Sequence, residues 1–455
     1  MTGEDPDTVP GPLARIWERD LGKVVTTFVV MYAAYGVLGL VSGLSIRGLI
    51  ATLVQLTLLI AIYAMLSLAL NLQWGYTGLF NIGIVGFMAV GAYTMLMVSK
   101  PAASESAAAL SGGLGMPFVV GALAGIAAAA LLGLVVALPA LRLRADYLAI
   151  VTIAMAEIVR FIYQSGTFQE FTLAGYELGT GGGRGLLVNF DDPITAYVLG
   201  SGPFKGFVDA FDAAIGAAGT YAPILELFVI DVALLGVVAV YYWLFIRTGK
   251  SPFGRVLKAI REDEDVARAL GKNTGRFKIK AFMLGCALMG LAGVFYAVYF
   301  LGSVQPIAFK PRFTFFIWVA LIIGGAGSYT GSVIGSVLFV GVLLRGPLFL
   351  KNVITNLVSV GDAPSTIAGG LGGLLSLDVA PLIAYTLANI NLFRIVALGV
   401  VLIALMKTRP QGLFGHRKET AASIPLGRSG PGGRDTPGKQ THSDEAAGDE
   451  RGDRP

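Results

Sequence analysis

The sequence predicts an all-α, polytopic membrane protein with about ten membrane segments. Of its 455 residues, 55% are hydrophobic and 14% are charged, whereas soluble domains usually carry about 25% charged residues. Long apolar runs recur along the chain, and a helix needs about 20 apolar residues to cross a bilayer core. The 61 glycines suit closely packed transmembrane helices. A water-soluble globular fold is therefore excluded.

The clearest candidate spans are the long apolar runs. They are residues 24–44, 49–72, 116–141, 146–164, 221–246, 281–301 and 390–406. The run 77–98 is richer in glycine and contains Asn81, so we expect a broken or re-entrant element, or a span buried by its neighbours. The run 313–345 is long enough for two short spans, split at the glycines of residues 324–327.

Basic residues in short loops predict the orientation, because Lys and Arg are enriched in cytoplasmic loops. With ten segments, four basic clusters fall on one side, and both termini are then cytoplasmic. The clusters are Arg15, Arg19 and Lys23; Arg142 and Arg144; the loop 247–280; and Lys407, Arg409, Arg417 and Lys418. The opposite side receives residues 165–220, with six acids and two basic residues.

We expect three parts in the chain. Residues 1–23 form a cytoplasmic N-terminal segment, residues 24–415 a transmembrane domain, and residues 416–455 a disordered cytoplasmic tail, because the tail is polar and lacks apolar periodicity. The formal charge of +5 is spread over ends and loops, so it indicates topology and not nucleic-acid binding. The single cysteine, Cys286, allows no internal disulfide and indicates no cysteine-based metal site.

The loop 247–280 holds ten Lys or Arg and only four acids. Ser251 suits a helix N-cap and Pro252 the first helical position. The apolar side chains of this helix share one face, with the basic ones elsewhere: Phe253, Val256, Leu257 and Ile260 against Arg255, Lys258 and Arg261. The acids at 262–265 favour the start of a second short helix, and Gly271 suits its C-terminal cap. An ordinary positive-inside loop explains the composition equally well.

The order Asp265-Val266-Ala267, followed by Gly271 four residues after Ala267, resembles the EAA loop of ABC importer permeases. In that family the loop docks onto the ATPase subunit. Here Asp replaces Glu and Val replaces the first Ala, and the proline that many versions carry ten residues after the glycine is absent, since that position is Ala281.

The wider sequence resembles the branched-chain amino-acid ABC permease family. The matching blocks follow the family's order and cover roughly residues 50–415: residues 78–93, 147–160, 180–182, 251–271, 289–293, 323–325 and 409–415. The resemblance implies a permease subunit of a cell-membrane complex. The other members of the complex are a second permease, two ATPases and an extracytoplasmic binding protein. The family favours a heterodimer of permeases, and the ATPases bind the ATP and Mg²⁺. The residues it implies for ATPase coupling are Gly254, Arg255, Asp265, Ala267 and Gly271.

Polar residues within the spans are candidates for the translocation pathway, because charges inside a bilayer are costly and normally point inward. Glu157 and Arg160 lie three residues apart on one helical face, although a structural ion pair is the alternative. Asn81 and Gly83 fit a broken segment that borders a cavity, although close helix packing explains the glycine equally well. Asp231 in the run 221–246 is a similar candidate, with a position near the outer surface as the alternative.

Two observations indicate that this chain is not itself an enzyme and binds no cofactor. Gly249-Lys250-Ser251 resembles the end of a P-loop, but position 244 is Leu where that motif needs glycine. No intramembrane His/Asp cluster or serine nucleophile pattern is visible. A stand-alone secondary transporter remains an alternative to the ABC importer, and urea or short amides remain alternative substrates to branched-chain or other hydrophobic amino acids.

Overall fold

The computed structural model describes residues 20–101, 112–140, 145–173, 175–188, 222–357, 361–372 and 378–414, together with residues 205, 206, 210 and 213. Several expectations lie outside these residues. They are the predicted tail, most of the N-terminal segment, the basic residues Arg142 and Arg144, and much of the predicted outer loop.

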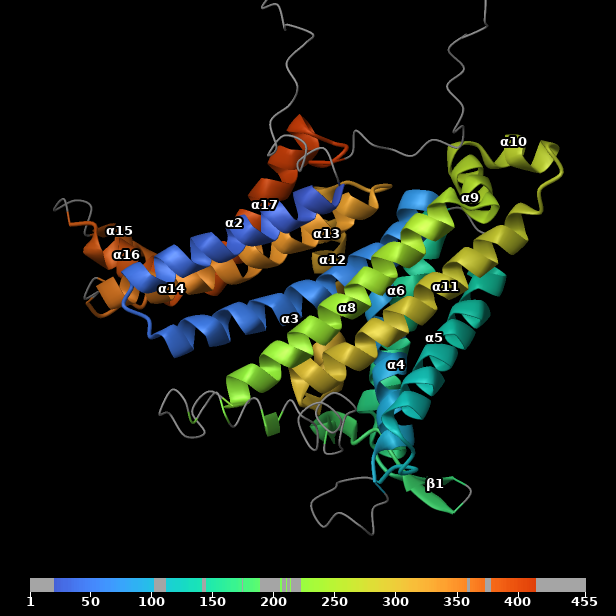
Figure 1. Cartoon of the computed structure of the whole chain (residues 1–455), viewed down its shortest axis with the longest axis horizontal. Helices are drawn as coiled ribbons and strands as arrows, with labels where there is room; N and C mark the ends of the chain where they lie inside the picture. The colour runs from blue at the N-terminus through green and yellow to red at the C-terminus, as the bar shows by residue number, and fades with distance from the viewer. Residues whose placement is uncertain are drawn as a thin grey trace, which may run out of the picture. The chain divides into compact units, whose positions relative to one another are not determined.

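The described chain is almost entirely helical (Figure 1). Its helices are α2 (Asp20–Val41), α3 (Ile46–Asn71), α4 (Ile84–Ser99), α5 (Phe118–Ala140), α6 (Ala145–Gln164), α8 (Ala222–Lys250), α9 (Pro252–Glu262), α10 (Glu264–Ala269), α11 (Thr274–Phe295), α12 (Pro311–Gly324), α13 (Tyr329–Leu338), α14 (Gly346–Leu357), α15 (Ile367–Gly372), α16 (Ala380–Ala388) and α17 (Ile390–Thr408). Wider, π-helical turns extend α3, α11 and α13 over Leu72–Tyr76, Tyr296–Leu301 and Phe339–Arg345.

Two small antiparallel sheets accompany the helices. β1 (Phe171–Leu173) pairs with β2 (Tyr176–Leu178), with Phe171 opposite Leu178. β3 (Leu186–Leu187) pairs with β4 (Ser303–Val304), so it joins the segment after α6 to the segment after α11. The sheet with β1 lies at the opposite end of the helices from α9 and α10 (Figure 1), and the β3–β4 sheet follows the end of α11 that is away from α10.

The prediction of an all-α membrane fold is confirmed. Among the described residues, eight helices are long and apolar enough to cross a bilayer, and two shorter apolar helices, Ile84–Ser99 and Pro311–Gly324, accompany them. These two occupy the runs for which the sequence predicted irregular elements. The split expected within 313–345 is confirmed, because α12 ends at Gly324 and α13 begins at Tyr329.

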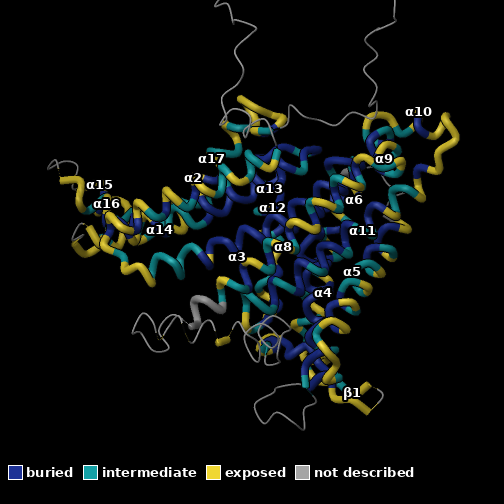
Figure 2. Tube along the Cα trace, in the orientation of Figure 1, coloured by how far each residue is buried: buried dark blue, intermediate teal, exposed yellow. Residues whose placement is uncertain are grey.

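The core of the bundle is formed by α3, α4 and α11 (Figure 2). The most apolar stretches of α3 and α11 are each 67% buried, whereas that of α17 is 6% buried and that of α2 is 17% buried. Helices α2 and α17 therefore present wide apolar faces outward. Such faces suit contact with lipid or with a second membrane subunit.

Glycines bring α4, α5 and α11 into backbone contact. A methyl group added at Gly293 would overlap the backbone of Met88, and one added at Gly91 would overlap the backbone of Gly290. Gly125 approaches Gly91 in the same way. Close approach of this kind is a principal source of helix association in membranes. Lipid tails are as apolar as the side chains, so close packing and not the hydrophobic effect holds the helices together.

The replacement Gly293→Ala should therefore destabilise the bundle. Overpacking of this kind costs about 1–3 kcal/mol or more, so we expect a clearly lower melting temperature of the purified protein in detergent. The matched control is Gly236→Ala on α8, where an added methyl meets no atom within 4 Å. Equal melting temperatures for the two variants would contradict this packing.

Candidate functional site

Helix α9 is built as its sequence predicts at its start. Ser251 caps it, since its side chain accepts a hydrogen bond from the Gly254 amide at 3.2 Å, and Pro252 occupies the first turn. Leu257 and Ile260 are buried. Phe253 stacks on a ring of α11, that of Phe277, with 5.5 Å between ring centroids. The apolar face of α9 thus lies against the membrane helices.

The sequence predicts that the basic residues of α9 lie away from its apolar face. Two of them instead contact buried parts of the protein. Lys258 is only 4% exposed, and its ammonium lies 5.2 Å from the centre of the Tyr76 ring. Arg261 donates a hydrogen bond to the carbonyl of Gly75. Both contacts are with the π-helical turn after α3, where long basic side chains bury their stems and satisfy backbone carbonyls. Arg255 is exposed.

Helix α10 begins within the predicted acid cluster and ends at the predicted cap, Gly271. Asp263 begins it, because its Oδ1 accepts hydrogen bonds from the amides of Asp265 and Val266 at 2.9 and 3.0 Å. Gly271 ends it with φ of +76°, and the Gly271 and Lys272 amides donate to the Arg268 and Ala267 carbonyls. This pair of bonds forms a Schellman cap, which favours glycine in the left-handed conformation.

An ion pair ties α10 to the start of α11. Glu264 accepts a hydrogen bond from the Lys278 ammonium and lies 3.2 Å from the Arg268 guanidinium. Partial burial raises the pKa of Glu264, but the hydrogen bond and charge of Lys278, with the charge of Arg268, outweigh it and hold that pKa below its ordinary value. The carboxylate therefore stays ionised at neutral pH, and the ion pair connects α10 to α11.

The outer surface of this α9–α10 unit is partly apolar. Val266 is 55% exposed and Leu270 is 73% exposed, beside the Asp265 side chain at 89%. Val266 and Leu270 lie four residues apart and so share one face of the helix. Of the other residues that the sequence suggests for coupling, Ala267 and Gly254 are buried, and a methyl at Gly254 would overlap the Thr248 carbonyl. Leu270 was not singled out from the sequence, although its spacing from Val266 in a polar loop was a usable signal.

The segment 77–83 breaks the helical chain between α3 and α4, and Asn81 holds it in place. This side chain is fully buried. Its Nδ2 donates to Gln73 Oε1 at 2.8 Å, and its Oδ1 accepts from the Gly83 amide at 2.8 Å. The Asn81 carbonyl accepts from the Trp318 indole at 3.0 Å. All these groups are satisfied within the protein.

Gly83 is the point at which this broken segment meets α6. A methyl group there would overlap the Thr152 carbonyl, and the Ile82 amide donates to Thr152 Oγ1 at 3.0 Å. Close packing therefore accounts for the glycine.

A second break, at residues 325–328 between α12 and α13, is satisfied by Asn71 at the end of α3. Asn71 Oδ1 accepts from the Gly327 amide at 2.7 Å, and its Nδ2 donates to the Ser328 carbonyl at 3.1 Å. Sequence reasoning missed Asn71, although a buried amide at the end of an apolar run was a signal for it.

Glu157 and Arg160 form a closed pair on α6. The Arg160 guanidinium reaches Glu157 Oε2 at 2.6 Å and Gln164 Oε1 at 3.1 Å, and it lies 4.4 Å from the Phe161 ring centre. The side chains of Arg160 and Glu157 are 13% and 29% exposed. The two charges thus neutralise each other on one helix. Asp231 on α8 is 3% exposed, and its Oδ1 has no partner among the described residues.

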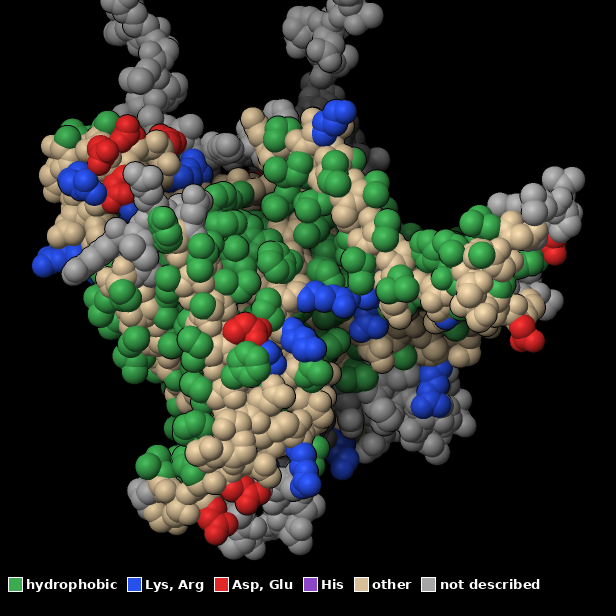
Figure 3. Space-filling view, turned by 180° about the vertical axis from the view of Figure 1, so that it is seen from behind, with side chains coloured by type: hydrophobic (Ala, Val, Ile, Leu, Met, Phe, Trp, Pro, Cys, Tyr) green, Lys and Arg blue, Asp and Glu red, His purple; other side chains and the backbone are tan. Residues whose placement is uncertain are grey.

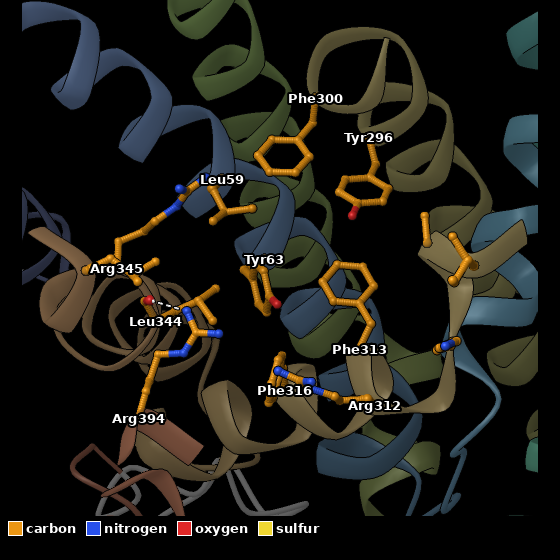
Figure 4. A pocket seen from close by; sticks show the side chains of 14 residues that line it. Leu59, Tyr63, Tyr296, Phe300, Arg312, Phe313, Phe316, Leu344, Arg345 and Arg394 are labelled. Carbon is orange, nitrogen blue, oxygen red and sulfur yellow. Dashed lines mark hydrogen bonds between the residues drawn. The ribbon is translucent and has the colours of Figure 1, made fainter. Parts of the chain in front are cut away.

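A cationic cavity of about 390 Å³ lies between α3, the end of α11, α12, the end of α13 and α17 (Figure 4). Aromatic and aliphatic side chains form most of its wall, and four basic side chains border it. The lining residues are Leu59, Tyr63, Tyr296, Phe300, Ile307, Ala308, Lys310, Arg312, Phe313, Phe316, Leu344, Arg345, Leu348 and Arg394. Figure 3 shows Lys and Arg side chains gathered on one face of the molecule, among hydrophobic side chains and beside an acidic one.

The arginines of this cavity come from three separate helical segments. Arg394 donates to the Leu344 carbonyl at 3.0 Å, and its buried Nε has no partner among the described residues. Arg312 lies 5.2 Å from the Phe316 ring centre. None of the carboxylates in the described ranges pairs with any of the arginines. Sequence reasoning missed all three, although a charge at position 345 or 394, inside or beside a long apolar run, was a signal.

An apolar cavity of about 560 Å³ lies nearer to the α9–α10 end, between α12 and α17. Its wall includes a cluster of three rings, those of Trp74, Phe80 and Trp318, whose centroids lie 4.7 to 5.4 Å apart. Met406 and Gln411 close it from the other side.

Comparison with known proteins identifies relatives for most of the chain. The model of the family described as "Branched-chain amino acid transport system / permease component" matches residues 52–405. The high-affinity branched-chain amino acid transport system permease proteins LivM of Salmonella typhimurium and Escherichia coli are each 31% identical over 287 residues, covering 63% of this chain and 62% of theirs. This chain thus spans about three fifths of the length of those relatives.

A more distant relative covers a larger share of its own length. The probable branched-chain amino acid transport permease protein LivM of Methanocaldococcus jannaschii is 28% identical over 313 residues, which is 64% of this chain and 80% of that protein. No solved structure matches the chain significantly.

The Schellman cap at Gly271 gives a direct test of the α9–α10 unit. An L side chain in the left-handed conformation costs about 1–2 kcal/mol, so Gly271→Ala should speed amide hydrogen exchange across residues 264–271. The matched control is Gly275→Ala, where helical backbone accepts alanine and the nearest atom is 3.8 Å away. Unchanged exchange in Gly271→Ala would contradict the cap's role.

Proposed function

The chain belongs to the family of branched-chain amino acid transport permease components, and on this premise we propose that it forms the translocation pathway of an ABC importer. It is a multi-pass protein of the cell membrane. The proposed cargo is a branched-chain or other hydrophobic amino acid. Hydrolysis of ATP in partner subunits drives its uptake, and the ATP and Mg²⁺ belong to those partners.

The observation that carries the proposal is the α9–α10 unit with its exposed Val266 and Leu270. Two exposed apolar side chains on a capped, ion-paired element suit a protein partner better than water. Gly249 and Lys250 lie in the last turn of α8 and not in a phosphate-binding loop, which supports placing the nucleotide on another chain. Arg255, Asp265 and Gly271 are then part of the docking surface, while Gly254 and Ala267 let the unit pack closely.

The α9–α10 unit has the connections needed to transmit motion. It is tied to α11 by the Phe253–Phe277 stack and the Glu264–Lys278 ion pair. It is tied to the end of α3 by Arg261 and Lys258. Closure of the ATPase pair would therefore displace the end of α3 and the start of α11 together. Rigid-body movement of this kind switches transporters between inward and outward openings.

Further partners follow from the same proposal. The outward apolar faces of α2 and α17 suit lipid and a sister permease, and an extracytoplasmic binding protein delivers the cargo at the end opposite α9–α10. Asn81 and Gly83 are proposed to shape the broken segment beside the pathway, and Glu157 and Arg160 to border it as a neutral pair.

The docking surface can be tested by Leu270→Asp. A buried, unpaired carboxylate in an apolar contact costs several kcal/mol, so the ATPase subunits should no longer co-purify with the variant. The matched control is Leu187→Asp, because Leu187 is also an exposed leucine, at 46%, but lies on β3 at the other end of the helices. This control should retain the ATPases.

Two results would contradict the docking assignment. One is normal recovery of ATPase subunits with Leu270→Asp. The other is a wild-type chain that purifies alone from its native membrane and transports without any ATPase, as a stand-alone secondary transporter would.

A further inference from the structure

The arginines of the cationic cavity lie at similar depth although they belong to different helices. Arg312 lies roughly 18 Å from the end of α12 at Gly324, Arg345 roughly 24 Å from the start of α13, and Arg394 roughly 21 Å from the end of α17, at a rise of about 1.5 Å per residue. Those three helix ends lie together. Leu413, just after α17, donates its amide to the Ile323 carbonyl at 2.9 Å, and α13 follows α12 directly.

Arg312 and Arg394 lie one and four residues from the starts of α12 and α17, so the cavity lies near the ends of these helices that are away from Gly324 and Thr408. Guanidinium groups beside apolar membrane helices are costly against lipid and normally face water or a partner charge. Within the described residues no carboxylate forms an ion pair with them. The cavity therefore holds a positive field that an anionic group would relieve.

The shape and chemistry of the wall narrow the ligand. Guanidinium groups bind carboxylates through two parallel hydrogen bonds. Opposite them stand aromatic rings, with Phe313 5.2 Å from both Tyr63 and Tyr296 between ring centroids. The Tyr63 and Tyr296 side chains point into the cavity (Figure 4). Rings suit an apolar side chain, and tyrosine hydroxyls can accept hydrogen bonds from an ammonium.

We propose that this cavity is the membrane site for the amino acid itself, with Arg312, Arg345 and Arg394 binding its carboxylate and the aromatic wall holding its apolar side chain. The inference rests on the proposed function and sharpens it. A zwitterionic amino acid supplies the anionic group that the three cations lack. Urea and short amides are neutral and would leave them uncompensated, so the cavity favours an amino acid over those alternatives.

The test is binding of radiolabelled leucine to the purified permease–ATPase complex without the soluble binding protein. Arg345→Gln and Arg312→Gln should each weaken leucine binding about tenfold or more, because each removes a charge-assisted hydrogen bond. Arg345→Lys keeps the charge and should weaken it less. Arg312 is exposed, so its replacement removes a charge with little loss of packing. The matched control is Arg47→Gln, an exposed arginine outside the cavity, which should bind as the wild type does.

Competition identifies the recognised group. Unlabelled leucine should displace the label, whereas leucinamide, which lacks the carboxylate, and urea should not. Equal displacement by leucinamide overturns the proposal. Unchanged leucine affinity in both glutamine variants also overturns the proposal. This holds even if the two variants lose co-purified anionic phospholipid.

The same preparations separate this inference from the proposed function. The wild-type complex could import leucine in vesicles while the arginine variants bind leucine as tightly as the wild type. In that case the carboxylate site is wrong and the proposed importer function is retained. If the wild-type complex imports urea and not leucine, the amino-acid importer is wrong and the cavity assignment falls with it.

Discussion

Every backbone polar group that lies in the hydrocarbon must find its partner inside the protein, because lipid offers none. Among the described residues, two interruptions of the helices, at residues 77–83 and 325–328, meet this constraint through asparagine side chains. Asn81 satisfies the first interruption and Asn71 the second, each through hydrogen bonds of 3.1 Å or less. The interruptions are thereby fixed in one conformation.

These fixed interruptions connect the two sites. The π-helical turn after α3 receives Arg261 and Lys258 from α9, and Asn71, just before that turn, holds the start of α13. Helices α3, α12 and α13 then run from this junction to the cationic cavity, where they contribute Tyr63, Arg312 and Arg345. A displacement of α9 would thus reach the cavity through rigid helices and not through flexible loops.

Features that depend on neighbouring residues were predictable from the sequence. Features that bring distant segments of the chain together were not. The spans followed from apolar length, and the caps at Ser251 and Gly271 followed from local chemistry. Burial of Lys258 was not predictable, because it depends on a π-helical turn some 180 residues earlier in the chain. The cationic cavity gathers side chains from segments far apart in the sequence. One chain without an alignment carries no signal that they meet, although each charge near an apolar run was a warning by itself.

An amino-acid pathway driven by a partner ATPase can be measured in proteoliposomes that contain the whole complex and its binding protein. Accumulation of labelled leucine is followed with ATP supplied on the α9–α10 side. We expect accumulation that requires ATP and does not occur with ADP. Accumulation driven by a proton or sodium gradient in the absence of ATP would contradict this expectation.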